Sequence, residues 1–388
     1  ASSWAPFVVH ASRFLRPGGR LAMVMPSELG HAMYAREVLR FLVGNFRHVA
    51  VEMFRDKLFG DLSQSTVLLL CEGYGEQCRA FLIASSTGLN GSDRQVARAD
   101  IEAVKSGRFR FTHYLVAPKV RELYQTLTTR PNVHALGEVA DVGIGYVTGA
   151  NDFFHVSAEE ARQWNIPKQY LRPCVLNLRG FKEIEYTLEA WKAKRNQGEK
   201  TYLLSLPPLI AKKLPSSVQK YLRYGESNEL SGRYKCRIRE YWYVVPHVRV
   251  TDAFLSYMSG EQPLLVANAA NLVAPNTVHV LRFDRRFNPL SHAASWRSSL
   301  TRLSCEMEGH ALGGGLFKLE PSEAERVLLV RPSSGTSRTL VSKLKKNVEH
   351  SDEIADKYLL RRQLALSESD CQSLRDAAAK LEAWRKHK

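Results

Sequence analysis

The sequence predicts an α/β fold in three parts: the C-terminal half of a doubly wound sheet in residues 1–117, a mixed α+β domain in residues 118–335, and a helical tail in residues 336–388. Three observations predict it. Short apolar runs alternate with stretches of helical spacing at the start of the chain. Short strands and helices mix after Pro118. Leucines then recur at helical spacing near the end.

The first elements can be read in order. Residues from Trp4 to Leu15 predict a helix, because Pro17 and the two following glycines stop it. The apolar run from Arg20 to Met25 lies between Gly and Pro, which predicts a strand buried on both faces. Ser27 is positioned to cap the next helix, whose apolar residues include Leu29, Met33, Val38, Phe41 and Leu42.

The next strands predict a hairpin. Val49, Val51 and Met53 alternate as in a half-buried strand, and Ser65 to Leu70 form another apolar run. The loop between them, which contains Phe59, is too short for a crossover helix. We therefore expect the two strands to be antiparallel, at the edge of the sheet. Residues from Cys78 to Phe111 predict a strand pair and a connecting helix.

Later elements are shorter. Residues Glu189 to Gly198 predict an exposed, charged helix, and residues Leu264 to Val280 predict two short strands. After Gly335 we expect a polar tether, and then a helical appendage that contains Leu359, Leu360, Leu364, Leu366, Leu374 and Leu381.

Charge indicates a polyanionic partner. The chain has 55 Lys and Arg against 39 Asp and Glu, for a formal net charge of +16. Residues 118–335 alone carry 29 Lys and Arg against 21 Asp and Glu. This excess favours nucleic acid, and a generally basic protein is the alternative.

Other patterns argue against a metal site, a secretory signal, a membrane segment, and hydrolase or nuclease chemistry. The six cysteines are scattered and form no Cys-x-x-Cys pair, so we expect no metal site. No secretory signal and no apolar run of about 18 residues is present, which predicts a cytoplasmic protein without a membrane segment. No carboxylate pair, hydrolase-like His/Ser/Asp spacing or nuclease-like Asp…Glu-x-Lys array is recognisable.

Several motifs resemble one known family. They are Phe14-Leu15-Arg16-Pro17-Gly18-Gly19-Arg20-Leu21, Met25-Pro26-Ser27-Glu28-Leu29, the run from Leu58 to Val67, Leu136 to Val142 with Gly145, Thr148 to Phe154, and Gly313 to Leu319. Together they resemble the gamma-class adenine-specific DNA methyltransferases of type I and type IIG restriction–modification systems. The resemblance extends from about Trp4 to Pro332.

The resemblance implies a Rossmann-like methyltransferase sheet in residues 1–117 and a target recognition domain for double-stranded DNA in residues 118–335. Such enzymes flip an adenine out of the duplex and transfer a methyl group from S-adenosylmethionine to its exocyclic amine. Extrusion is needed because that nitrogen lies within the base stack.

Two motifs of that family are missing in context. The family's Phe-x-Gly-x-Gly cofactor loop and its Asn-Pro-Pro-Tyr motif do not occur near the sheet. The nearest strings, Asn288-Pro289-Leu290 and Leu206-Pro207-Pro208, lie far downstream. The chain begins with Ala1-Ser2-Ser3-Trp4. We therefore expect the cofactor site to lie mainly in an upstream segment or in a second chain, and this chain alone to be inactive.

Phe59 is the candidate catalytic residue. The resemblance places an aromatic side chain in this loop against the flipped base, where stacking offsets the cost of unstacking by about 1–3 kcal/mol. Gly60 and Asp61 would shape the same loop. The alternative is that Phe59 closes the edge of the sheet.

Thr148 and Asn151 are candidate DNA contacts after the glycine-rich segment Gly143 to Gly149. A nucleotide-binding loop is a less favoured interpretation, because no clear helix follows directly. A plain glycine-rich turn is the remaining alternative.

Lys235, Arg237 and Arg239 alternate, so they share one face if residues from Arg233 to Val245 are extended. The aromatic residues Tyr241, Trp242 and Tyr243 follow, which favours a nucleic-acid groove. His247 and Arg249 continue the alternation. An edge strand protected by charge is the alternative.

The remaining candidates are Asn268, Asn271, Arg297 and Lys318, with Asn276 and Arg302 as weaker ones. An Asn amide can pair with adenine, although Asn more often marks a turn. Lys318 follows three glycines and is a candidate phosphate contact, or a solvated side chain. A DNA-binding module without catalysis, a split methyltransferase, and an enzyme that acts on RNA or protein stay open as alternatives.

Overall fold

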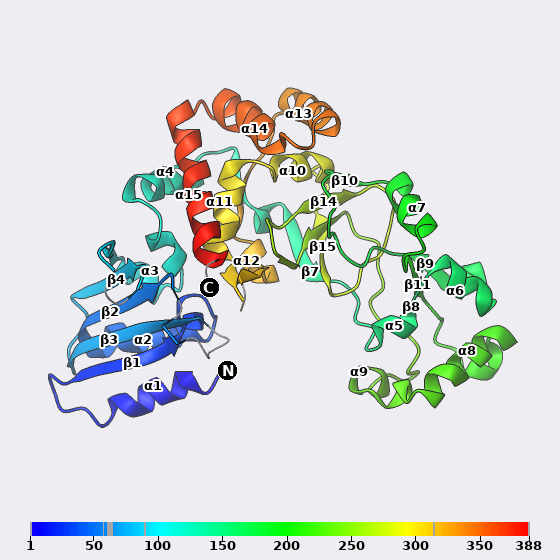
Figure 1. Cartoon of the computed structure of the whole chain (residues 1–388), viewed down its shortest axis with the longest axis horizontal. Coiled ribbons are helices and arrows are strands. Elements are labelled where there is room, and N and C mark those ends of the chain that lie inside the picture. The colour runs from blue at the N-terminus through cyan, green and yellow to red at the C-terminus, as the bar shows by residue number, and fades with distance from the viewer. Residues whose placement is uncertain (1, 57, 60–64, 89–90, 313–314, 387–388) are drawn as a thin grey trace.

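The structure is a computed structural model that describes residues 2–56, 58–59, 65–88, 91–312 and 315–386. Within these residues the fold is mixed α/β with several sheets, as predicted. Figure 1 shows an arch: the N-terminal sheet forms one arm, the segment from α5 to α9 forms the other, and the last helices cross the top. We call these parts the left arm, the right arm and the central body.

The left arm is built on one five-stranded sheet with the order β1-β3-β2-β4-β5. The strands are β1 (Arg20–Pro26), β2 (Phe46–Phe54), β3 (Thr66–Tyr74), β4 (Ala80–Ser86) and β5 (Gln95–Ala99). The predicted antiparallel pairing of β2 with β3 is confirmed, with Val51 opposite Leu69. The predicted position was wrong, because β3 lies between β1 and β2 instead of at the edge. β2 and β4 are parallel.

β1 also differs from the prediction. It is the edge strand, and its side chains alternate between exposed and half-buried from Arg20 to Val24. An edge strand has only one sheet neighbour, so an apolar run there need not be buried on both faces. Val24 is 48% exposed.

The helices of this arm are α1 (Trp4–Ser12), η1 (Ser27–Gly30), α2 (Ala35–Asn45), α3 (Ile101–Lys105) and η2 (Phe111–Tyr114). Ser27 does not cap a long helix, as the sequence had suggested. It opens the 3-10 turn η1, and α2 begins at Ala35 without a side-chain cap. The buried face of α2, which includes Val38 and Leu42, packs into the core beside the sheet.

The central body holds a second five-stranded sheet with the order β10-β14-β12-β15-β7. Its strands are β10 (Glu185–Tyr186), β14 (Leu265–Asn268), β12 (Ala253–Ser256), β15 (Val278–Phe283) and β7 (Ala140–Ile144). Of the two strands predicted between Leu264 and Val280, β14 is present, whereas β15 begins only at Val278 and extends beyond the predicted range.

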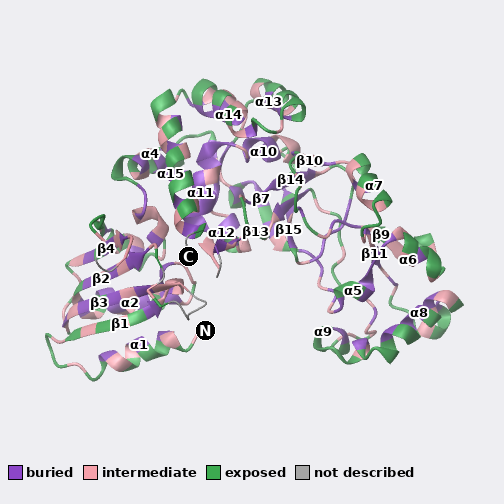
Figure 2. Cartoon of the chain, in the orientation of Figure 1, coloured by how far each residue is buried: buried purple, intermediate pink, exposed green. Residues whose placement is uncertain are grey.

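Smaller elements complete the body. They are α4 (Pro118–Thr128), β6 (Val133–Ala135), η3 (Leu136–Glu138), β13 (Met258–Ser259), α10 (Pro289–Ser295), α11 (Ser299–Glu308), β16 (His310–Ala311), β17 (Phe317–Lys318), α12 (Pro321–Ala324) and β18 (Leu328–Val330). Every residue of α11 except Arg302 is buried, so this helix is the centre of the body (Figure 2).

The right arm contains short elements, most of them around a second hydrophobic cluster, whereas Trp191 lies in a third cluster. They are α5 (Asn151–Phe154), β8 (His155–Val156), α6 (Ala158–Gln163), η4 (Lys168–Tyr170), β9 (Leu171–Pro173), α7 (Leu188–Asn196), β11 (Tyr202–Leu204), η5 (Ala211–Lys213), α8 (Ser216–Ser227), η6 (Leu230–Gly232) and α9 (Tyr234–Arg237). α7 is the predicted charged helix, although its Trp191 is buried.

The C-terminal segment is part of the core. It consists of α13 (Ser334–Lys346), α14 (Ser351–Ala355), a π-helical segment (Asp356–Gln363) and α15 (Glu368–Lys386). The predicted polar tether is wrong, because α13 begins at Ser334 with Ser333 as its cap. Leu359, Leu374 and Leu381 are buried, so these helices are packed rather than appended.

One hydrophobic cluster extends from Ala5 to Leu381 and joins the left arm to the central body. The domain boundaries predicted near residues 117 and 335 lie within that cluster, so the hydrophobic core is continuous across both of them. Across the described residues, no helix is both long and apolar enough to span a bilayer.

Candidate nucleic-acid interface

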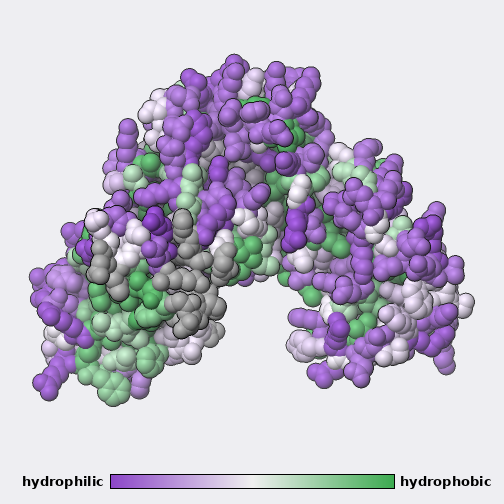
Figure 3. Space-filling view, in the orientation of Figure 1, coloured by the Kyte–Doolittle hydropathy of each residue, from purple (hydrophilic) through white to green (hydrophobic). Residues whose placement is uncertain are grey.

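A large cavity lies where the central body meets the right arm. It has a volume of about 1210 Å³, and its walls include α5, the loop from Leu176 to Lys182 and the hairpin from Ser256 to Leu264. α5 and the C-terminal end of α15 both border the opening between the two arms in the space-filling orientation (Figures 1 and 3). We call this cavity the inner groove.

Cations outnumber carboxylates in the inner groove, and many of them are paired. Arg302 binds Asp352 and Glu382, and Lys200 lies near Asp152 and Glu160. Among the described residues, the lining cations without a carboxylate partner are Arg179, Lys182 and Arg297. The unpaired positive charge is therefore concentrated around the loop from Leu176 to Lys182.

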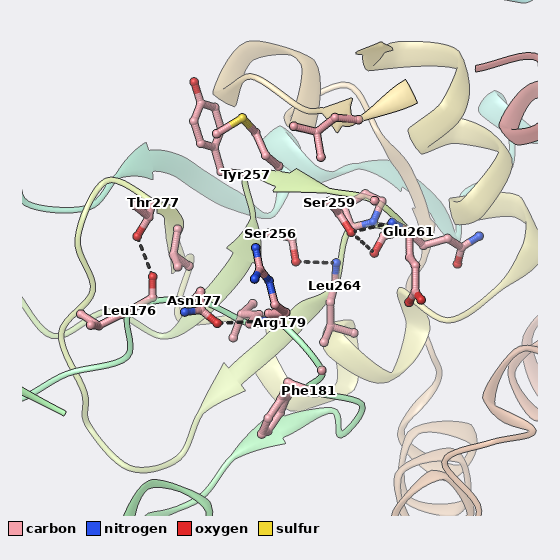
Figure 4. A pocket seen from close by; sticks show the side chains of 18 of the residues that line it. Leu176, Asn177, Arg179, Phe181, Ser256, Tyr257, Ser259, Glu261, Leu264 and Thr277 are labelled. Carbon is pink, nitrogen blue, oxygen red and sulfur yellow. Dashed lines mark hydrogen bonds between the residues drawn. The ribbon is translucent and has the colours of Figure 1, made fainter. Parts of the chain in front are cut away.

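This loop is shaped by local hydrogen bonds (Figure 4). The side-chain oxygen of Asn177 accepts a hydrogen bond from the backbone N–H of Arg179 at 3.1 Å. Gly180 has a φ of +69°, which favours glycine. The ring of Phe181 stacks on Tyr186, with centroids 4.8 Å apart and planes 10° apart.

Arg297, a predicted DNA contact, holds the far end of the same loop. Its Nη2 donates to the carbonyl oxygen of Lys182 and, at 3.1 Å, to that of Glu183. Burial lowers the pKa of the guanidinium. Arg297 lines the inner groove, but its donors are directed at the protein backbone, so its geometry is that of a support for the loop.

Thr148 and Asn151 are brought together, as the sequence suggested, but Thr148 is not available to DNA. It is buried, and its hydroxyl donates to the side-chain oxygen of Asn151 at 2.5 Å while accepting from the backbone N–H of Ala150. Asn151 is exposed and lines the inner groove. Of the two, Asn151 alone is placed to contact a ligand.

The glycines before them serve packing. A Cβ on Gly145 would lie 2.2 Å from the carbonyl oxygen of Ala274, so only glycine fits. Gly149 has a φ of +81°, and a Cβ there would lie 2.9 Å from the Cβ of Lys235. The segment Gly143 to Gly149 is therefore a loop that lets the backbone pack closely against two neighbours.

The predicted strand that carries Lys235, Arg237 and Arg239 does not form. Residues Tyr234–Arg237 form the short helix α9 and the following residues form turns, so the three side chains do not share a strand face. The backbone instead makes helical hydrogen bonds, from the N–H groups of Cys236 and Arg237 to the carbonyl of Arg233, and the buried thiol of Cys236 donates to the carbonyl of Thr148. Lys235 and Arg237 remain exposed beside Tyr234, which is 62% exposed.

Arg239 is bound to the backbone of the protein. Its guanidinium donates to the carbonyls of Val147 at 2.7 Å, Thr148 at 2.9 Å and Trp242 at 3.3 Å. Burial lowers the pKa of this group. Arg239 therefore fixes the loop after β7 against α9. Arg249 is exposed, and His247 has a φ of +58°.

Asn268 and Asn271 belong to a turn. The Asn268 amide donates to the carbonyls of Thr251 and Leu272, and its oxygen accepts from the backbone N–H of Leu272. Asn271 has a φ of +54°. The alternative that Asn marks a turn fits both positions. The amide of Asn268 has no free edge to offer a base.

Lys318 is occupied as well. Its Nζ lies 2.6 Å from a carboxylate oxygen of Glu320 and 5.2 Å from the centre of the Tyr257 ring. Gly313 and Gly314, which precede it in the family-like motif, lie outside the described residues.

Phe59 lies in the segment between β2 and β3 and is 42% exposed. The alternative in which it closes the sheet edge would bury it further. Gly60 and Asp61 lie outside the described residues.

A small cavity lies at the carboxyl ends of β1 and β2. Its volume is about 90 Å³, and its lining includes Ser27, Met53 and Ser65. Pockets for drug-sized ligands measure roughly 300–1,000 Å³. This cavity is therefore too small to hold S-adenosylmethionine by itself. The described residues also contain no cluster of three or more potential metal ligands.

Sequence reasoning missed Arg179 and Lys182. A signal was present, since Asn177 and Gly180 flank Arg179 and are residues that favour turns. The sequence contains many other cations, and only the fold shows that Arg179 and Lys182 lack a carboxylate partner.

The comparisons with known proteins agree on one family. The family model for the C-terminal domain of the Type II methyltransferase M.Eco57I matches residues 108–364. A curated relative, the Type II methyltransferase M.AccI of Acinetobacter calcoaceticus, is 21% identical over 334 residues, which cover 84% of this chain and 61% of the relative. The chain thus spans less than two thirds of that relative.

Similar solved structures include the type IIG restriction endonuclease BpuSI, with 13% identity, a TM-score of 0.46, and coverage of 99% of this chain and 49% of that one. The Type IIL restriction-modification enzyme MmeI, solved in complex with DNA, has 13% identity and a TM-score of 0.47, with 97% and 48% covered. The resemblance to methyltransferases of restriction–modification systems is confirmed by the family model, which covers more than half of the sequence. The chain belongs to the family of the C-terminal domain of the Type II methyltransferase M.Eco57I.

Proposed function

We propose that this chain recognises the target sequence of an adenine-specific DNA methyltransferase and supplies the end of its catalytic domain. The proposal rests above all on the inner groove, which holds three cations without carboxylate partners inside the region matched by the family model. Double-stranded DNA is the proposed ligand, because a positively charged concave surface attracts the phosphate backbone.

The division of labour follows the predicted boundaries. Residues 1–117 end the catalytic sheet, residues 118–335 bind DNA, and residues 336–388 brace the two. Phosphate contacts would supply most of the affinity, and a few side chains would set the specificity. The predicted contacts that remain sterically available are the exposed residues Asn151, Lys235, Arg237, Arg249 and Asn271.

The left arm supports the catalytic part of the proposal. Within the described residues, nothing pairs with the outer edge of β1, and apolar side chains such as Val24 of β1 and Phe7 of α1 are exposed. Figure 3 shows hydrophobic surface over the lower part of this arm. An open strand edge is a template for further strands. We propose that the sheet continues there and that the added segment carries the glycine loop and the Asn-Pro-Pro-Tyr motif.

S-adenosylmethionine would supply the methyl group, bound mainly by that added segment. Phe59 has one role in this proposal, which is to stack on the extruded adenine. Its exposure on the loop after β2 is compatible with that contact.

The test is binding of this chain to a pool of randomised duplex DNA at moderate salt, followed by sequencing and a salt titration. Enrichment of one short adenine-containing site, with affinity that falls steeply as salt rises, is the expected result. No binding to duplex DNA at low salt would reject the recognition role. Competition with duplex RNA distinguishes the nucleic acids.

A split enzyme is the second candidate, because the open edge of β1 can be completed by a separate chain as well as by a covalent segment. Co-purification of a partner that carries the glycine loop would favour it. A DNA-binding module without catalysis predicts instead that the full gene product does not bind S-adenosylmethionine.

A further inference from the structure

We propose that Arg179 determines part of the DNA sequence specificity by donating two hydrogen bonds to one guanine. The inference rests on the proposed DNA-recognition function and assigns a specificity-determining role to this residue. Arg179 is exposed, lines the inner groove and points into it from the loop between Leu176 and Lys182 (Figure 4).

The charge of Arg179 is free to act on a ligand. In the described part of the chain, no carboxylate lies within ion-pair distance of its guanidinium, although Arg302 and Lys200 in the same cavity are both paired. Across the cavity, the hairpin from Ser256 to Leu264 presents Glu261 on its turn.

The backbone that carries Arg179 is fixed from both sides. The Asn177 side chain accepts from the Arg179 backbone N–H, and the Phe181 backbone N–H donates to the carbonyl of Leu178. The stacked ring of Phe181 anchors the next turn to β10. Arg297 then holds the carbonyls of Lys182 and Glu183.

Such support favours base reading over a phosphate contact. A charged side chain can contact a phosphate group from many positions, so such a contact requires little positional precision from the protein. A base edge must be met at a defined position, and a rigid loop lowers the entropic cost of placing the side chain there. The planar guanidinium matches the O6 and N7 acceptors of guanine in the major groove.

The experiment compares the sequence profiles of four proteins on the same randomised duplex pool: the unaltered chain, Arg179→Ala, Arg179→Lys and Arg172→Ala. Arg172 is an exposed arginine on β9 that does not line the inner groove, so it controls for loss of one charge. Arg179→Ala is expected to lose preference for guanine at one position, with affinity for the best site reduced roughly 5- to 150-fold. Arg172→Ala should keep the profile.

Arg297→Lys provides a second, independent test. Nη2 of Arg297 donates to both carbonyls, and lysine keeps the charge but replaces the rigid planar guanidinium with a flexible ammonium, so the loop should loosen. We expect the same guanine position to relax while Arg179 is intact. Circular dichroism before binding confirms that each variant is folded.

Three outcomes overturn the inference. If Arg179→Ala weakens all sequences equally and reduces the salt slope by about one, Arg179 contacts phosphate. An unchanged profile means that Arg179 does not contact DNA. If the unaltered chain fails to bind DNA at low salt, the proposed function fails, and this result is distinguishable because it does not depend on any variant.

Discussion

Arg385 and Glu306 form a two-pronged ion pair that fastens the last helix to the centre of the protein. The Arg385 Nε and Nη2 lie 3.1 and 2.9 Å from the two carboxylate oxygens of Glu306, and both side chains are almost fully buried. Arg385 also donates to the carbonyl of Gly315 at 2.6 Å. The pair therefore joins α15, α11 and the segment before β17.

Removing one partner of this pair should destabilise the protein strongly. Arg385→Ala leaves the Glu306 carboxylate buried without compensation, and burial already raises its pKa. We expect a loss of about 3–5 kcal/mol in the free energy of unfolding, measured by urea denaturation. Arg385→Met combined with Glu306→Gln should recover most of the loss, and a double variant as unstable as Arg385→Ala would contradict this account.

His155 should make stability depend on pH. Burial, with help from Lys200, lowers the pKa of His155 to about 4 from its ordinary value of 6.5. Since the unfolded chain binds the proton more readily, the stability from neutral His155 is full above about pH 6.5 and is lost as the pH falls through about 4. We expect a contribution of up to about 3 kcal/mol.

The measurement is urea denaturation of the unaltered chain and of His155→Gln between pH 4 and 7.5. The variant should show a smaller decrease in stability on acidification, because it has no ring to protonate. Parallel curves for the two proteins would show that His155 does not cause the pH dependence.

Arg237 and Arg239, two of the cations near α9, should have different roles: Arg237 in DNA binding and Arg239 in stability. Arg237 is exposed, so Arg237→Ala should weaken DNA binding for all sequences, reduce the salt slope by about one, and leave the melting temperature unchanged. Arg239 is bound to three backbone carbonyls. Arg239→Ala should cost about 1.5–3 kcal/mol in stability. Thermal melting and salt-titrated binding of both variants check this, and a destabilised Arg237→Ala would reject the distinction.

Asn268 should matter for stability and not for sequence choice. Asn268→Ala removes three hydrogen bonds to the backbone of the turn, so we expect a loss of about 1–3 kcal/mol. The profile obtained from the DNA pool should stay the same. A shift in the preferred base in a folded Asn268→Ala protein would instead indicate that Asn268 contacts a base.

Phe59 should act only on the flipped base. In the complete methyltransferase, Phe59→Ala should reduce the fluorescence gain of a 2-aminopurine placed at the target adenine and slow methylation about 5- to 150-fold. Affinity for the duplex should change little. Phe14→Ala is the control, because Phe14 is an even more exposed aromatic on the same arm. Equal effects of the two substitutions would argue against stacking.

The sequence predicted the parts that depend on local patterns. Alternation at Val49, Val51 and Met53 gave a correct strand, and the short loop after it gave the correct antiparallel pairing. It could not place β3 between its neighbours, because strand order is set by packing between distant segments. The strand predicted around Arg237 was wrong because alternating basic residues also occur in a short helix, and the backbone there makes helical hydrogen bonds to the carbonyl of Arg233.

The candidate site was predicted least well where side chains bind the protein itself. Thr148, Arg239, Asn268, Arg297 and Lys318 have the chemistry of DNA contacts, and each is engaged by neighbouring protein groups. Residue type alone does not reveal which donors are already used. Arg179 was overlooked for the complementary reason, because its availability depends on the absence of a nearby carboxylate in three dimensions.

The burial of α11 beneath α15 has a consequence for how the molecule is made. Contacts between α11 and α15, such as the ion pair of Glu306 with Arg385, cannot form until α15 has been synthesised. Until then the apolar surface of α11 has no cover from α15, and the cluster that begins at Ala5 stays incomplete. The core around α11 is thus completed only after α15 is made, and a chain that lacked α15 would expose this apolar surface and be prone to aggregate.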